Sequence, residues 1–339
     1  MGRYILKRIG YILLVFLVLS FLVYFIYNLL PIDKAAETAR AEVQASGGAL
    51  DYAERLQYWR EQYGEDGALP LRYLRWLGLA PFRDGSYKGL LQGNLGRSVK
   101  YARPVIEVLK EPMGNTVLLN LTVTLLSLSI TVPLGVLCAL KRGSRLDTAL
   151  RVGTVVGYSL PVFIIAIVFI RLFSVSLGIF PVSGMETAGS GYTGFRYFLD
   201  RAYHLVLPIF VMVFCSLGGM TRYVRSAMSD AMTQDHIRTA RAKGLSPSSV
   251  IWRHGFRNAL IPLVTLVIGW FLSIFSGSLM IENIFALNGI GKVYYDALVG
   301  GDSEVALALQ TFYILVSLVG NLLTDLAYGF LDPRIRVGR

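Results

Sequence analysis

The chain has 339 residues, of which 54% are hydrophobic and 16% are charged, and its formal net charge is +11. So apolar a composition indicates a polytopic membrane protein and disfavours a soluble domain. The two cysteines, Cys138 and Cys215, fall inside apolar runs, which favours a packing role over a disulfide framework or a metal site.

Six uncharged runs are long enough to cross a bilayer, whose core of about 30 Å takes roughly 20 apolar helical residues. They are Ile9–Leu30, Gly114–Leu140, Val152–Ile170, Ala202–Thr221, Asn258–Ile281 and Val305–Thr324. We therefore expect an all-α integral membrane protein with six transmembrane helices. The first run follows basic residues, as a secretory signal does, but it is too long for the typical apolar region of a signal peptide and no small-residue cleavage site follows directly, so it is expected to be an uncleaved first span.

Basic residues are concentrated in four segments outside these runs. They are Arg3, Lys7 and Arg8; Lys141, Arg142, Arg145 and Arg151; Arg222, Arg225, Arg238, Arg241, Lys243, Arg253 and Arg257; and Arg334, Arg336 and Arg339. This positive-inside asymmetry predicts that both termini lie in the cytoplasm. The excess of positive charge is thus a topology signal, and nucleic acid is not an expected partner.

The segment between the first two runs, residues 31–113, carries nearly balanced charge and is expected to form an extracytoplasmic cap. Apolar residues recur at helical spacing from Asp33 to Tyr63, with breaks expected at Ser46–Gly48 and Tyr63–Gly64. The residues alone leave open whether the cap is a small helical cover or a docking surface for a soluble partner.

These patterns divide the chain into four parts. Residues 1–30 form the cytoplasmic N-terminus and first transmembrane helix, and residues 31–113 form the cap. Residues 114–331 form a five-helix core that includes a cytoplasmic loop at 221–258, and residues 332–339 form a cytoplasmic tail.

The loop Thr221–Arg257 is expected to contain two or three short helices. Arg238, Arg241 and Lys243 complement the dipole at the end of one helix, and Gly244 suits the left-handed residue that follows it. Ser246 suits the N-cap of the next helix, near Pro247–Phe256, and Pro247 its first position. On physical grounds such a helix is either an interfacial anchor or a docking element.

The sequence RTARAKGLSPSSVIWRHGFRNALIP, which starts at Arg238, resembles the permease loop of the oligopeptide/dipeptide branch of ABC importers. In the wider family the glycine follows a Glu-Ala-Ala pattern, and here those positions hold Arg238, Thr239 and Ala240. The resemblance continues through GNLGRS at 93–98, PVSG at 181–184, HLVLP at 204–208, IENIF at 281–285, NGIG at 288–291 and DPRIR at 332–336. The cap resembles that of the first permease of the pair.

The resemblance implies a type I ABC importer permease fold in the bacterial cytoplasmic membrane, surrounded by lipid. It implies three kinds of partner: a second homologous permease, two cytoplasmic ATPase subunits and an extracytoplasmic substrate-binding protein. ATP and magnesium would bind the ATPase subunits, and no cofactor is expected in this chain. Peptides are the expected substrate, and nickel and short oligosaccharides are alternatives within the same family.

The residues expected to engage an ATPase follow from the resemblance. They are Arg238, Thr239, Ala240, Arg241, Ala242, Lys243, Gly244, Leu245, Ser246, Pro247, Val250, Ile251 and Trp252. An apolar-to-charged change at Ile251 is expected to uncouple ATP hydrolysis from transport while the membrane helices stay folded.

No catalytic residue and no metal site are expected. Gly289–Lys292 looks like the end of a phosphate loop, but Ala286 stands where the first glycine is required and Val293 where Ser or Thr would hold magnesium. Glu282, at the outer end of the fifth run, is explained by an interfacial position and is also a candidate outer gate.

Two other classes of protein remain as alternatives. An ion-coupled secondary transporter or channel needs an ionisable group near the bilayer centre, whereas Arg171 and Asp325 both map near the ends of apolar runs. A membrane scaffold would recruit partners through the loop without transporting anything.

Overall fold

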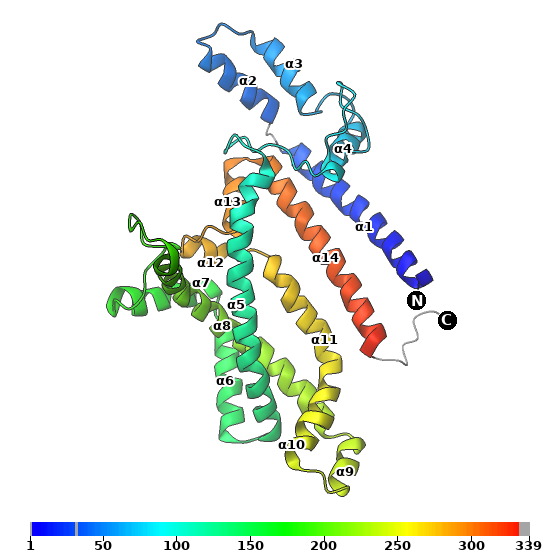
Figure 1. The fold of residues 1–339 in the computed structure, drawn as a ribbon, viewed down its shortest axis with the longest axis vertical. Helices are drawn as coiled ribbons and strands as arrows, with labels where there is room; N and C mark the ends of the chain where they lie inside the picture. The colour runs from blue at the N-terminus through cyan, green and yellow to red at the C-terminus, as the bar shows by residue number, and fades with distance from the viewer. Residues whose placement is uncertain (1, 31–32, 332–339) are drawn as a thin grey trace. The chain divides into compact units, whose positions relative to one another are not determined.

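The computed structural model describes residues 2–30 and 33–331 (Figure 1). Over these residues the chain is helical, and its only β pairing is an isolated bridge between Arg97 and Pro104. The expected all-α architecture is therefore confirmed for this part of the chain. The predicted tail at 332–339 and the start of the predicted cap at Pro31 and Ile32 lie outside the described residues.

Within the part of the chain that the structure describes, five helical stretches are long and apolar enough to cross a membrane, and a shorter apolar helix covers Val162–Ser176. The five are α1 (Gly2–Leu29), α5 (Val105–Leu140), α8 (Gly194–Met232), the stretch beginning at Pro247, and α14 (Ser303–Leu331). Helix α8 has 39 residues, which at about 1.5 Å per residue makes it about 58 Å long. It therefore exceeds the bilayer core and includes the first part of the predicted loop Thr221–Arg257, up to Met232, which was expected to form separate short helices.

The third apolar run does not form one continuous helix. It is divided between α6 (Arg145–Ser159) and α7 (Val162–Phe169), and α7 continues as the π-helical segment η2 (Ile170–Ser176). The break lies at Leu160, whose backbone is extended (φ −90°, ψ 133°). The following Pro161 disfavours a helical conformation for the residue before it, which explains the division.

The fifth run belongs to a helix that starts earlier than the sequence suggested. The helix comprises α10 (Pro247–Ser249), the π-helical segment η3 (Val250–Phe256), α11 (Arg257–Leu272) and the 3-10 turn η4 (Ser273–Phe275) without interruption. The expected separate helix over Pro247–Phe256 is therefore wrong, and Pro262 lies within α11. After an extended Ser276, α12 (Leu279–Ile284) and α13 (Ile290–Gly300) follow.

The chain divides into two compact units. One contains residues 5–112 and 293–318, including α1, the cap helices α2 (Lys34–Ala45), α3 (Tyr52–Gln62) and α4 (Leu69–Leu77), and the first half of α14. The expected breaks at Gly47, Gly48 and Gly64 are confirmed, because all three adopt positive φ.

The core of this unit joins the cap to two apolar helices. Tyr73 and Leu77 of α4 pack with Phe16 and Tyr24 of α1 and with α14, and the Tyr73 hydroxyl lies 2.8 Å from the Ser20 hydroxyl. The cap is thus a helical structure fixed to the membrane part of its own unit.

The other unit contains residues 113–292 with short segments from both ends of the chain. Its packing brings α5 and α8 so close that a Cβ atom on Gly135 would lie 2.6 Å from the Val224 side chain. A second apolar cluster joins Val136 of α5, Met228 of α8 and Leu263 of α11. These contacts fix the two ends of the loop that lies between α8 and α10.

Candidate functional site: the loop between α8 and α11

Helix α9 (Asp235–Ala242) stops at a glycine C-cap of the Schellman type. The Gly244 N–H donates to the Arg241 carbonyl over 3.0 Å, and the Leu245 N–H donates to the Ala240 carbonyl over 3.4 Å. Gly244 has a φ of +71°, which confirms the predicted left-handed position.

The next helix begins three residues later with the predicted cap. The Ser249 N–H donates to the Ser246 hydroxyl oxygen over 3.3 Å, and Pro247 occupies the first helical turn. Because each cap ends or begins a helix at a defined residue, the connection from α9 to α10 is short and its direction is set by local geometry.

One face of α9 is buried against the helices on either side of the loop. Ile237 and Ala240 pack with Val250 of η3 and with Met232 at the end of α8. The Asn258 amide lies 2.9 Å from Nε2 of His236, which adds a polar contact between α9 and α11. Helix α9 is thus held by both neighbouring helices.

Gly255 allows η3 to approach α8 closely. A Cβ atom at this position would lie 2.6 Å from Sδ of Met232 and 2.9 Å from Cε of Met228. Because both atoms lie toward the flexible ends of methionine side chains, a larger residue at position 255 would require these two side chains to shift.

The predicted coupling residues divide into an exposed set and a packed set. The exposed set is Arg238, Thr239, Arg241, Ala242, Lys243, Gly244, Leu245, Ser246, Pro247 and Trp252. Ala240 and Val250 are buried, and Ile251 is half-buried against the cluster that contains Met228. Ala240, Val250 and Ile251 therefore position the loop, whereas the exposed set is available to a partner.

The exposed set combines positive charge with apolar surface. The side chains of Leu245 and Trp252 are 40% and 47% exposed, and the Trp252 ring contacts the Phe256 ring at a centroid distance of 5.3 Å. Arg241 and Lys243 are exposed beside Leu245 in the chain. An exposed indole with flanking cations suits docking to a protein surface with an apolar groove and acidic edges.

Glu282 lies in a second polar site, in α12. Its carboxylate is 1% exposed and accepts three hydrogen bonds: from the Thr116 hydroxyl over 3.0 Å, the Ser278 N–H over 3.1 Å and the Lys292 N–H over 2.9 Å. The carboxylate thereby joins α5, the start of α12 and the first turn of α13.

The glycine-rich turn before α13 is shaped around this carboxylate. A Cβ atom on Gly289 would lie 2.4 Å from Cδ of Glu282, and the Ile290 N–H donates to the Thr116 hydroxyl oxygen over 2.9 Å. Amide groups at a helix N-terminus favour an anion, and here the anion is a side chain of the same chain. This explains why the turn looks like part of a phosphate loop.

Several contacts that support these two sites had no signal in the sequence. Asn115 donates to the Asn288 carbonyl over 2.7 Å and also accepts a hydrogen bond from Arg201. Thr116 is 166 positions from Glu282 in the chain. Single polar residues inside an apolar run do not reveal which distant group they contact.

Comparisons with known proteins give concordant results. The family model described as "Binding-protein-dependent transport system inner membrane component" matches residues 131–337. Oligopeptide transport system permease protein AppB of Bacillus subtilis is 37% identical over 287 residues, which cover 84% of this chain and 86% of the relative. Di/tripeptide transport system permease protein DppB of Pseudomonas aeruginosa is 34% identical over 359 residues, with 99% of each chain covered.

A solved structure has a similar fold. It is an inward-facing form of the MetNI methionine ABC transporter, with a TM-score of 0.50 and 17% sequence identity, and the match covers 69% of this chain and 98% of that one. At this identity the likeness concerns the fold alone, which is the helical fold of an ABC importer permease.

Proposed function

Because the chain belongs to the family of binding-protein-dependent transport system inner membrane components, we propose that it is a permease subunit of an ATP-driven peptide importer. The peptide substrate is supported by the names of its relatives AppB and DppB, which are described as oligopeptide and di/tripeptide permeases. The nickel, oligosaccharide and ion-coupled alternatives receive no comparable support.

The observation that carries the coupling role is the exposed face of α9 and η3. Leu245 follows the exposed Lys243 and Trp252 precedes the exposed Arg253 in the chain, while the opposite face of α9 is packed against α8 and η3. We propose that this face docks on a cytoplasmic ATPase subunit.

The helix that begins at Pro247 and ends at Phe275 offers a direct route from the docked loop into the membrane. When ATP closes the ATPase pair, α9 would move with its partner, and this helix would move with α9 because no flexible joint interrupts it. Access to the translocation path would then change from one side of the membrane to the other.

The proposal includes the complete assembly. A second homologous permease would complete the translocation path, two ATPase subunits would bind on the cytoplasmic side, and a substrate-binding protein would deliver peptide on the outer side. Both termini would lie in the cytoplasm, as the distribution of basic residues predicts. ATP and magnesium would bind the ATPase subunits.

Glu282 is proposed to serve the outer gate as a positioning residue. Its carboxylate is fully engaged by Thr116, Ser278 and Lys292, so it is suited to hold the turn at 289–292 in place. It is not free to bind a passing substrate.

Uptake of radiolabelled tri-L-alanine tests the function. In a host without other peptide uptake, deletion of this chain is expected to abolish accumulation, and the wild-type chain supplied from a plasmid is expected to restore it. Co-purification in mild detergent is expected to recover a second permease and ATPase subunits. Unchanged uptake after deletion, or recovery of the chain without any ATPase, would contradict the proposal.

A further inference from the structure

A cavity of about 1080 Å³ lies within the unit that contains the cap. Its walls come from the last turns of α1, the starts of α2 and α14, one face along α3, the loop after α3, and α4 through Arg72. Since α1 and α14 are both long and apolar enough to cross a membrane, the end of the one and the start of the other place this cavity at the membrane surface.

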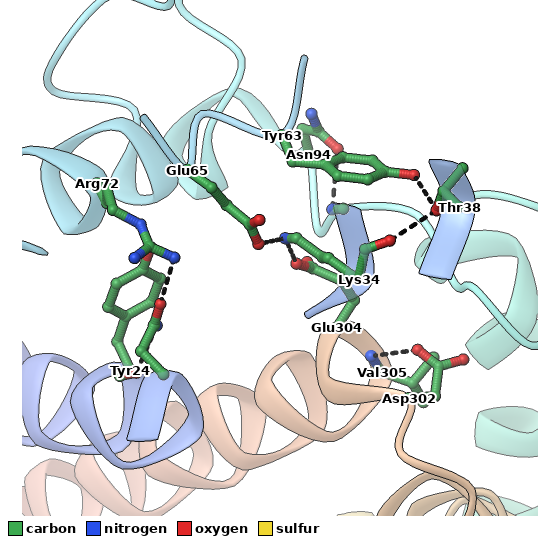
Figure 2. Close-up of polar contacts among 12 residues, drawn as sticks. Tyr24, Lys34, Thr38, Tyr63, Glu65, Arg72, Asn94, Asp302, Glu304 and Val305 are labelled. Carbon is green, nitrogen blue, oxygen red and sulfur yellow. Dashed lines mark hydrogen bonds and ion pairs between the residues drawn. The ribbon is translucent and has the colours of Figure 1, made fainter. Parts of the chain in front are cut away.

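Three ionised side chains form a cluster on one wall of the cavity (Figure 2). The Lys34 ammonium lies 3.3 Å from the Glu65 carboxylate and also pairs with Glu304. Burial alone lowers the pKa of Lys34, but pairing with Glu304 and Glu65 raises it above its ordinary value. The cluster therefore holds one positive and two negative charges, which leaves one negative charge uncompensated.

Arg72 lines the same cavity, and its positive charge has no negative partner in the part of the lining that the structure describes. One of its terminal nitrogens donates to the Asn28 side-chain oxygen over 2.7 Å, whereas its buried Nε has no hydrogen-bond partner. No carboxylate among the described residues pairs with it. The other ionised lining residues are each paired: Asp33 with Arg60, Glu61 with Arg83, and Asp66 with Arg75, which lies outside the lining.

The cavity thus carries an excess negative charge at the Lys34 cluster and an excess positive charge at Arg72. A ligand with one ammonium and one carboxylate group complements this arrangement, because each of its charges meets an uncompensated partner. Most of the lining side chains are polar or charged, which suits a peptide backbone better than an acyl chain. The volume is slightly above the range of about 300–1,000 Å³ that is usual for ligand sites.

We propose that this cavity binds a short peptide by its free termini, with the ammonium group at Glu65 and Glu304 and the carboxylate at Arg72. The inference rests on the proposed function for its choice of peptide, and it adds a peptide site in the cap of the permease itself. Recognition of both termini is independent of side chains, so the site accepts peptides of varied sequence.

Calorimetric titration of the purified full-length chain in detergent tests the site. The probes are tri-L-alanine, its N-acetyl derivative, its C-terminal amide and glycerophosphoethanolamine, which carries the charges of a zwitterionic lipid headgroup. Tri-L-alanine is expected to bind, and removal of either terminal charge is expected to weaken binding about tenfold, as the loss of one charge-assisted hydrogen bond does.

Two variants assign the termini to their partners. Arg72→Gln is expected to bind tri-L-alanine and its C-terminal amide with equal affinity. It should still bind tri-L-alanine more tightly than the N-acetyl derivative. Glu65→Gln is expected to reduce the distinction between free and acetylated N-termini and to retain the preference for the free acid. Arg55→Gln, on the same cap but outside the cavity, serves as the matched control and is expected to bind as wild type. A misfolded variant would lose binding of all the peptides together, whereas a variant that lacks one terminal contact would lose only the preference for that terminus.

Equal binding of free and blocked tri-L-alanine, or binding of glycerophosphoethanolamine in its place, would overturn the proposal. The uptake assay separates this result from the proposed function. Uptake that depends on the chain, without binding in the cavity, refutes the cap site alone. Uptake that is independent of the chain refutes the importer function, whatever the titration gives.

Discussion

Arg225 of α8 and Asp147 of α6 form a bidentate ion pair, with Nε 2.6 Å from Oδ1 and Nη2 2.9 Å from Oδ2. The Asp147 side chain is 1% exposed and also accepts a hydrogen bond from the Gly143 N–H over 3.0 Å. The pair therefore fixes the turn between α5 and α6 to the part of α8 that leads into the loop.

Replacing Asp147 by Ala is expected to lower the free energy of unfolding by about 3 kcal/mol, because it leaves a partly buried guanidinium without its partner. Arg225→Lys is expected to cost less, since it keeps the charge and loses only the two-pronged geometry. Unfolding in detergent with increasing denaturant measures both. Arg241→Lys, at an exposed position, is the control, and a wild-type transition for Asp147→Ala would refute the role assigned to the pair.

Trp252→Glu is expected to reduce peptide uptake at least about tenfold, since an exposed aromatic anchor is replaced by a charge of the wrong sign for an acidic partner surface. The thermal unfolding midpoint should stay within error of wild type, because the side chain is 47% exposed. Uptake and basal ATP hydrolysis in reconstituted vesicles provide the measurement. Thr239→Glu, on the exposed face of α9, tests whether charge alone has the same effect. Full uptake by Trp252→Glu would exclude this surface as the docking site.

Glu282→Gln is expected to destabilise the protein by about 2 kcal/mol, because an amide cannot accept all three hydrogen bonds that the carboxylate accepts. Gly289→Ala should have a similar effect, since its Cβ would overlap the same carboxylate. Denaturant unfolding compares both with Glu186→Gln, which is exposed. If Glu282→Gln unfolds as wild type does, the carboxylate does not hold the turn at 289–292.

Lys34→Met is expected to make the stability of the cap depend on pH. In the wild type the pKa of Lys34 lies above its ordinary value of 10.5. The stabilisation from the Lys34 charge is therefore fully present at pH values below 10.5 and is lost only as the pH rises through the raised pKa. In the variant, Glu65 and Glu304 repel each other when both are ionised, and protonation relieves the repulsion.

The thermal unfolding midpoint of Lys34→Met should therefore lie closer to wild type at pH 5 than at pH 8. Lys88→Met is the control, because its ion pair with Asp84 is exposed and is expected to contribute little. An equal deficit at both pH values would show that the two carboxylates do not interact in the folded variant.

The sequence predicted those features of the loop that are encoded locally. The left-handed Gly244, the Ser246 cap and Pro247 in the first turn are specified within a few residues, and all three are confirmed. The continuation of the predicted helix at Pro247–Phe256 into α11 was missed because the span was placed on the uncharged run that starts at Asn258. The break at Leu160 was missed although Pro161 signals it.

Contacts between distant residues could not be predicted in the same way. Glu282 and Thr116 are 166 positions apart, and Lys34 and Glu304 are 270 positions apart. The packing of Ile251 likewise depends on its contact with the cluster around Met228, so a charge at Ile251 is expected to disturb the loop itself. Trp252, its neighbour in the chain, is therefore the better position for the coupling experiment.

The π-helical segment Val250–Phe256 has a consequence for loops of different length. A π turn holds one residue more than an α turn, so deleting one residue here would restore a regular α-helix. Because the wider π turn absorbs the extra residue, the chain before the deletion would keep nearly the same orientation about the helix axis relative to α11. Val250 would still face Ile237, so α9 would keep its packing. The segment is thus a point at which the connection from α9 to α11 can lose one residue without altering the residues that cross the bilayer.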